Sequence, residues 1–164
     1  MTSSTEYKAT LEFPADTDIL ITRTFQAPAD LVYQAMTTPE HVRRWWGAGH
    51  GEVTTCDIDL RVGGKWRYVT KHIDFEVGFH GEYREIDSPG RLVATEAFEG
   101  IPDPDGNAAL NTVTFDEADG VTTMTLLVEM SSKENRDMMI ESGMEGGMQV
   151  SYDRLEDVLR EESA

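Results

Sequence analysis

The stretch SGMEGGMQVSYDRLEDVL, from Ser142 to Leu159, carries the pattern that decides the fold. At about 100° per residue, its apolar side chains gather within an arc of about 80° on one helical face. That face comprises Met144, Met148, Tyr152, Leu155 and Leu159. The opposite face carries Glu145, Gln149, Asp153, Glu156 and Arg160. This pattern predicts an amphipathic helix near the C-terminus.

The two halves of this helix offer different surfaces to a neighbour. Its C-terminal half carries ordinary core residues such as Leu155, whereas Met144 and Met148 in the first half adapt their shape to irregular gaps. Three glycines weaken the same half, each by roughly 0.5–1 kcal/mol relative to alanine. They are Gly143, Gly146 and Gly147. Either Met and Gly accommodate a tight helix–sheet crossing, or the first half is the wall of a space that side chains do not fill.

The rest of the chain predicts an antiparallel sheet. A first strand at 17–26 precedes two short helices, the second with Thr38 as N-cap and Pro39 at its first position. Further strands are predicted at 53–60, 65–71, 77–86, 92–98, 112–115 and 122–130. Ser131 and Glu134 form the signature of a capping box, from which the helical period runs to about Glu161. The order predicts an α+β fold, with a curved sheet wrapped around one long C-terminal helix.

Length and composition narrow the class of protein. The 164 residues contain no internal repeat or linker, so we expect one domain at 17–164 after an N-terminal extension at 1–16, a candidate extra edge strand. Acidic residues outnumber basic ones by 31 to 14, and the net charge of −17 repels nucleic acid. No apolar run approaches the roughly 20 residues of a membrane span. With no signal peptide visible and Cys56 as the single cysteine, we expect a cytoplasmic protein.

A helix laid across a concave sheet predicts a cavity between them. Aromatic rings alternate along the strands and face the Met-rich half of the helix, which is the usual profile of a small-molecule pocket. Trp45 and Trp46 are candidates to gate its mouth. The residues that we expect to bind the ligand are Trp46, Trp66, Tyr68, Phe79, Tyr83, Phe98, Met124, Met144, Met148 and Tyr152.

Motifs for cofactor or metal chemistry are absent from the sequence. His80 and Glu82 have the H-x-E spacing of zinc deaminases, but the P-C-x-x-C partner is missing. The histidines lie in different elements, so we predict no metal site, no cofactor and no assigned catalytic residue. Cys56 reads as a packing residue. Should the cavity perform acid–base chemistry, the candidates are His72, His80, Tyr83 and Glu96, of which Glu96 is the charge that we place inside the cavity.

Four strings, occurring in order from about Thr17 to Leu159, resemble segments of the AHSA-type proteins. The strings are FQAPADLVYQAMTTPEHVRRWWG, DLRVGGKWRYV, FHGEYREIDSPGRLVATEAFEG and SGMEGGMQVSYDRLEDVL. These proteins are bacterial and archaeal relatives of the C-terminal domain of the eukaryotic activator of the ninety-kilodalton heat-shock protein ATPase, within the SRPBCC (START-like, birch-pollen-allergen-like) superfamily. The resemblance implies a helix-grip fold of about seven strands with a cavity, and a link to stress response.

Sequence and resemblance together favour a binding protein over an enzyme. The expected ligand is a small, largely apolar or aromatic molecule. A cofactor-independent enzyme of polyketide cyclase or hydrolase type is an alternative that uses the same cavity, and a module that interacts with a chaperone or regulator is another. A homodimer and a chaperone partner both stay open.

Overall fold

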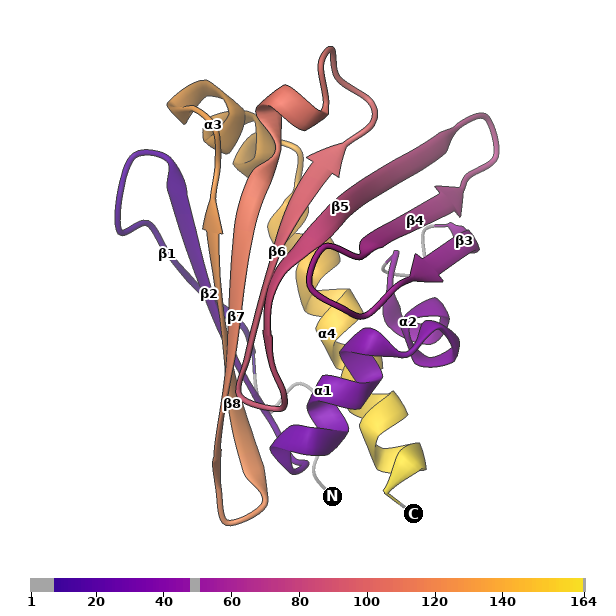
Figure 1. Ribbon diagram of the computed structural model, residues 1–164, viewed down its shortest axis with the longest axis vertical. Helices are drawn as coiled ribbons and strands as arrows, with labels where there is room; N and C mark the ends of the chain where they lie inside the picture. The colour runs from indigo at the N-terminus through magenta and orange to yellow at the C-terminus, as the bar shows by residue number, and fades with distance from the viewer. Residues whose placement is uncertain (1–7, 48–50, 164) are drawn as a thin grey trace.

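An eight-stranded antiparallel sheet, with strand order β1-β2-β8-β7-β6-β5-β4-β3, wraps around a helix in this protein (Figure 1). The computed structural model describes residues 8–47 and 51–163. The strands are β1 (Thr10–Glu12), β2 (Asp18–Phe25), β3 (Glu52–Ile58), β4 (Lys65–Lys71), β5 (Glu76–Asp87), β6 (Arg91–Phe98), β7 (Ala109–Ala118) and β8 (Val121–Glu129). The helices are α1 (Ala29–Thr37), α2 (Pro39–Trp45), α3 (Lys133–Glu141) and α4 (Met144–Glu162), with a 3-10 turn η2 at Asp105–Asn107.

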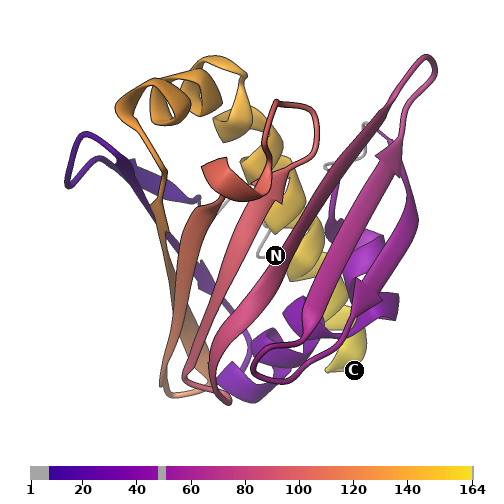
Figure 2. The same ribbon diagram turned by 45° about the horizontal axis from the view of Figure 1, so that its top comes forward.

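This architecture confirms the predicted α+β helix-grip fold, with two short helices between β2 and β3. The sheet has eight strands rather than about seven, because Thr10–Glu12 pairs antiparallel with β2. Figures 1 and 2 show α4, in yellow, crossing the concave side of the sheet. No helix among the described residues is both long enough and apolar enough to span a membrane.

The C-terminal helix is not continuous, and this part of the prediction is wrong. The N-cap of α3 is Ser132 rather than Ser131, since the Ser132 hydroxyl accepts a hydrogen bond from Asn135 N at 3.1 Å. Helix α3 then ends, and α4 begins after Gly143, whose φ of 84° lies in the left-handed region. A left-handed residue ends a right-handed helix, so Gly143 divides the predicted helix in two.

The C-terminal half of α4 packs as the sequence predicts. Leu155, Val158 and Leu159 are buried, and α1 and α2 pack against the same part of the helix. Trp45 at the end of α2 is buried as well, and its indole Nε1 donates to Ala35 O at 2.9 Å. Trp45 is therefore a structural residue rather than a gate.

A buried ion cluster joins the sheet to α4. Arg23 shares the inward face of β2 with Ile19, Ile21 and Phe25, and its side chain is fully buried. Its guanidinium lies 3.1 Å from Asp153 Oδ1 and 3.2 Å from Glu156 Oε1. Glu156, expected on the polar face of the helix, is thereby 2% exposed. The cluster fixes α4 against β2.

The glycines of α4 allow a matched test. Gly146 is exposed within the helix, and a Cβ added there meets no neighbouring atom, so tight crossing does not explain it. We expect Gly146→Ala to raise the free energy of unfolding by about 0.5–1 kcal/mol. Gly143→Ala should lower it by about 1–2 kcal/mol, because alanine is strained at positive φ. Urea denaturation measures both, and equal effects from the two variants would contradict the assignment.

The ion cluster gives a second test. Replacing Arg23 with Met leaves Glu156 buried without its guanidinium, so we expect a loss of about 3–5 kcal/mol in the free energy of unfolding. Glu156→Gln in the same background should recover part of that loss. Arg44→Met is the control, since Arg44 pairs with Glu161 and Glu162 at the surface and should cost at most about 1 kcal/mol. An Arg23→Met loss no larger than the control would refute the anchoring role.

Candidate functional site

The exposure of side chains on the inward face of the sheet changes along the length of α4. Beneath the C-terminal half, side chains such as Phe25 and Leu155 have no exposed surface. Met144 and Met148 in the N-terminal half, and Leu126 on β8, pack against the core but stay half-buried. Leu126 pairs with the buried Ile21 across β2 and β8, so it points inward and still keeps accessible surface. The candidate site lies on this part of the concave face.

Aromatic rings from three strands and the end of α2 form one wall of the site. Trp46 lies 4.9 Å from the Tyr68 ring and 5.9 Å from the Phe79 ring, measured between centroids. Trp66 lies 4.7 Å from Tyr68, and Phe79 lies 5.3 Å from Phe98. The rings are tilted or perpendicular to one another, which is a favourable packing for aromatic side chains.

A carboxyl group, Glu96 on β6, lies on the same inward face. Asn111 on β7 donates from Nδ2 to Glu96 Oε1 at 2.6 Å. Glu96 keeps some accessible surface, yet protein surrounds it closely enough that burial raises its pKa, while the Asn111 hydrogen bond acts in the opposite direction. An inward, desolvated carboxyl that a single amide orients can hold a proton or bind a hydrogen-bond donor.

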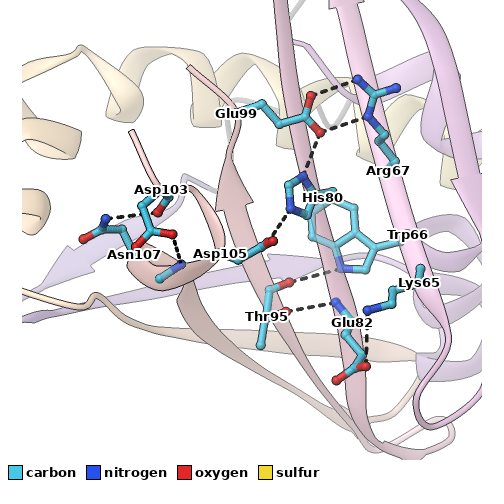
Figure 3. Close-up of polar contacts among 11 residues, drawn as sticks. Lys65, Trp66, Arg67, His80, Glu82, Thr95, Glu99, Asp103, Asp105 and Asn107 are labelled. Carbon is cyan, nitrogen blue, oxygen red and sulfur yellow. Dashed lines mark hydrogen bonds and ion pairs between the residues drawn. The ribbon is translucent and has the colours of Figure 1, made fainter. Parts of the chain in front are cut away.

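A break in strand pairing accompanies Glu96. Direct pairing of β5 with β6 stops after His80↔Ala97 and resumes at Tyr83↔Ala94. In the gap, Glu82 N donates to Thr95 Oγ1 at 2.9 Å, and Trp66 Nε1 reaches across β5 to Thr95 O at 3.1 Å (Figure 3). Only glycine fits at position 81, because a Cβ there would collide with both Thr95 O and the indole. These contacts set Trp66 beside the strand segment that carries Glu96.

Three tyrosines add hydroxyls to the inward face. Burial raises the pKa of Tyr68, Tyr83 and Tyr152, and the charge of Glu96 adds to the effect for Tyr68 and Tyr152. Their hydroxyls have no hydrogen-bond partner among the described residues, although each side chain is buried. Neutral, unpartnered hydroxyls near a carboxyl are suited to orienting a bound molecule.

The structure brings most of the ten predicted ligand-binding residues to the inward face. Five are buried, namely Trp66, Tyr68, Tyr83, Met124 and Tyr152. Four are half-buried and packed against the core, namely Trp46, Phe79, Met144 and Met148. Phe98 lies at the end of β6 and is 39% exposed. Met124 has no exposed surface and pairs with Phe115 and Arg23, so it contributes to packing.

Sequence reasoning missed Asn111 and Arg23 as polar residues of the interior. Asn111 precedes the strand predicted at 112–115, and the longer β7 places it on the inward face opposite Ala94. Arg23 lies two residues after Ile21 and two before Phe25, so its inward position was readable from strand alternation.

Both histidines proposed for acid–base chemistry lie away from this site. His80 projects to the outer side of β5, where Nδ1 is 2.7 Å from Glu99 Oε2 and Nε2 is 2.6 Å from Asp105 Oδ1 (Figure 3). Arg67 donates two hydrogen bonds to the Glu99 carboxylate at 2.9 Å. His72 stacks on Phe75 at the β4–β5 turn. Of the four candidates, only Tyr83 and Glu96 remain for interior chemistry.

Arg67, His80, Glu99 and Asp105 form a cluster on the outer side of the sheet, here called the outer cluster. The pKa values of this cluster and of Cys56 are shifted for different reasons. Asp105 and then Glu99 raise the pKa of His80, while Arg67 and then His80 lower the pKa of Glu99 to about 2. Burial raises the pKa of the Cys56 thiol to about 11, so it is a poor nucleophile. No group of three or more His, Cys, Asp or Glu is placed to hold a metal ion within the part of the chain that the structure describes.

A hollow of about 440 Å³ lies against β4, β5 and the end of β6. Its lining includes Arg67, Val69, Phe75, Phe98 and Glu99. Beside it, Ile73 at the β4–β5 turn is 99% exposed. Exposed apolar side chains outside the space between α4 and the sheet are what an interaction module requires.

Comparison with protein families identifies the relatives of this chain. The family described as Activator of Hsp90 ATPase homolog 1-like protein (AHSA1) matches residues 26–160. The chain belongs to this family. The AHSA1 match covers the two short helices, strands β3 to β8, α3 and almost all of α4. Among curated proteins, none matches the chain.

Solved structures of bacterial proteins share the fold of this AHSA1 member. A Rhodobacter sphaeroides protein superposes with a TM-score of 0.86 at 23% identity, covering 93% of this chain and 99% of that one. A Staphylococcus epidermidis protein gives 0.80 at 27% identity, covering 93% and 94%. Protein Ms6760 of Mycobacterium smegmatis gives 0.81 at 25% identity, covering 92% and 96%.

The outer cluster predicts a pH-dependent stability. Because its carboxylate partners raise the His80 pKa, its contribution should be complete below the ordinary value of 6.5 and lost as pH rises through the folded-state pKa. The lowered pKa of Glu99 makes its contribution complete above 4.5 and lost as pH falls toward 2. We therefore expect His80→Gln to lower the melting temperature most between pH 4.5 and pH 6.5, where both contributions are complete.

Thermal unfolding at a series of pH values measures this difference between wild type and His80→Gln. Asp105→Asn, which removes one of the two carboxylates beside His80, should give a smaller effect in the same window. A His80→Gln effect that stays constant from about pH 5 to about pH 9 would exclude the ionic role.

Proposed function

We propose that this protein binds a small, largely apolar or aromatic molecule between α4 and the concave face of the sheet. The observation that carries the proposal is the incomplete burial of inward side chains beside the N-terminal half of α4. Protein interiors are packed to the density of organic crystals, so a group of inward side chains that keep accessible surface implies unfilled space. Leu126, Met144 and Met148 belong to that group.

The composition of the face supports a largely apolar ligand. The Trp46 ring contacts the rings of Tyr68 and Phe79 along one side, and Met148 projects from α4 on the apolar stripe. Methionine side chains tolerate occupants of different shape, and aromatic rings offer flat apolar surface. A site of this kind binds mainly by excluding water from apolar surface.

Polar groups on the same face support one orientation of the ligand. Glu96 and Asn111 lie on neighbouring strands, and the Tyr152 hydroxyl projects from α4 near the charge of Glu96. Small-molecule sites commonly combine many apolar contacts with a few convergent polar groups. Membership of the AHSA1 family agrees with a binding role but names no ligand.

Met148→Trp tests the proposal. The larger indole should occupy the space beside Met144, one helical turn away, and lower affinity for N-phenylnaphthylamine, a neutral apolar dye whose fluorescence rises in apolar sites. We expect at least a tenfold loss, corresponding to about 1.4 kcal/mol. Fluorescence titration measures it, with circular dichroism to verify the fold.

Val150→Trp is the matched control, because Val150 is exposed on the other side of α4 and should leave dye binding unchanged. Leu155→Ala supplies the opposite case, an expected loss of about 2–5 kcal/mol in stability from a fully buried position. If wild type takes up no dye, or Met148→Trp binds it as well as Val150→Trp, the site is not where we place it.

A further inference from the structure

We propose that the ligand is an organic cation, a protonated amine on an apolar or aromatic body, and that Glu96 and Asn111 bind its ammonium group. This inference rests on the proposed function and names the chemical class of the ligand. It depends on three features of the inward face: a carboxyl group without a cation, an acceptor without a donor, and aromatic rings on the neighbouring strands.

Glu96 has no cationic partner among the described residues. Its neighbours on the inward face of β6 are Ala94 and Phe98, and its hydrogen bond comes from the neutral amide of Asn111. The buried cation on this side of the sheet, Arg23, already contacts Asp153 and Glu156. A carboxylate in an apolar site gains strongly from an added cation, because the low local dielectric strengthens their attraction.

Asn111 carries the unused acceptor. Its Nδ2 must face the Glu96 carboxyl, which leaves Oδ1 as the remaining polar atom of the amide. Oδ1 is buried and has no hydrogen-bond partner in the described part of the chain. Buried acceptors are normally satisfied, so an orphan next to a carboxyl marks a place for a donor. A primary ammonium has three N–H groups and can serve both Asn111 Oδ1 and the free oxygen of Glu96.

The rings complete a cation site. Trp66 and Tyr68 pack together on the inward face, and the pKa of Tyr68, raised by burial and then by the charges of Tyr83, Cys56 and Glu96, keeps its phenol neutral. Aromatic faces attract cations through their quadrupole, most strongly for Trp and in desolvated sites. The net charge of −17 also draws cations toward the protein and repels anions.

Isothermal titration of three probes tests the inference: phenylbutylamine, the neutral phenylbutanol and the anionic phenylbutyrate, at low ionic strength near neutral pH. The three share an apolar body and differ in the head group. We expect the amine to bind on the order of tenfold or more tighter than the alcohol, the range of a hydrogen bond to a charged group, and the anion to bind weakest.

Glu96→Gln should reduce the ratio of amine to alcohol affinity to about one, because the neutral amide keeps the shape but not the charge. Glu85→Gln is the control, since Glu85 is an exposed residue of β5 that pairs with Arg91 and its loss changes net charge equally. Phenylbutyltrimethylammonium keeps the charge without N–H groups, so it should bind more weakly than the amine in wild type.

The outcomes separate this inference from the proposed function. Equal binding of amine and alcohol, with N-phenylnaphthylamine still bound, would overturn the cation and leave the apolar site in place. An amine preference that Glu96→Gln and Glu85→Gln reduce equally would assign it to the overall charge and overturn the role of Glu96. Absence of binding by all probes and the dye would overturn both proposals.

Discussion

The buried contact between Arg23 and the two acids of α4 is the constraint on which the interior depends. Ion pairs removed from water are costly unless their geometry satisfies every charge, so such a contact admits few arrangements of helix against sheet. Asp153 and Glu156 are one helical turn apart, and β2 presents Arg23 between Ile21 and Phe25. The C-terminal half of α4 is therefore fixed at β2 and covered by α1 and α2. Its N-terminal half continues across the concave face, where Met144 and Met148 are less completely covered.

Sequence patterns predicted most of the fold because strand alternation and helix capping depend on residues that are close together in the chain. Strand alternation placed Lys65–Lys71 with both ends as observed, and Thr38 with Pro39 marked the start of α2. The joint at Gly143 escaped prediction, since glycine at an amphipathic position is compatible with a continuous helix and only the backbone conformation reveals the break. The predicted N-cap was Ser131 and the observed one is Ser132, because either hydroxyl can cap a helix and the fold decides which one does.

The candidate site was predictable only where a single strand determines it. Trp66, Tyr68 and Glu96 follow from alternation within β4 and β6, so their inward direction could be read from the chain. The amide that orients Glu96 depends on which residue of β7 lies beside β6, and pairing register is a property of two strands. The histidines show the same limit. His80 alternates with inward Phe79 and Gly81, yet its partners Glu99 and Asp105 both lie in the loop between β6 and β7.

The loop between β6 and β7 touches two parts of the molecule at once. Asp105 contacts His80 on the outer side of β5, while the Asn107 side-chain oxygen accepts hydrogen bonds from Asn135 at 3.2 Å and Ser131 at 3.4 Å at the start of α3. Helix α3 leads directly into the half of α4 beside the candidate site. The imidazole of His80 is thus connected, through one short loop, to the helix that leads into the candidate site. The NMR resonances of the His80 ring therefore offer a reporter of changes between α4 and the sheet that needs no added label.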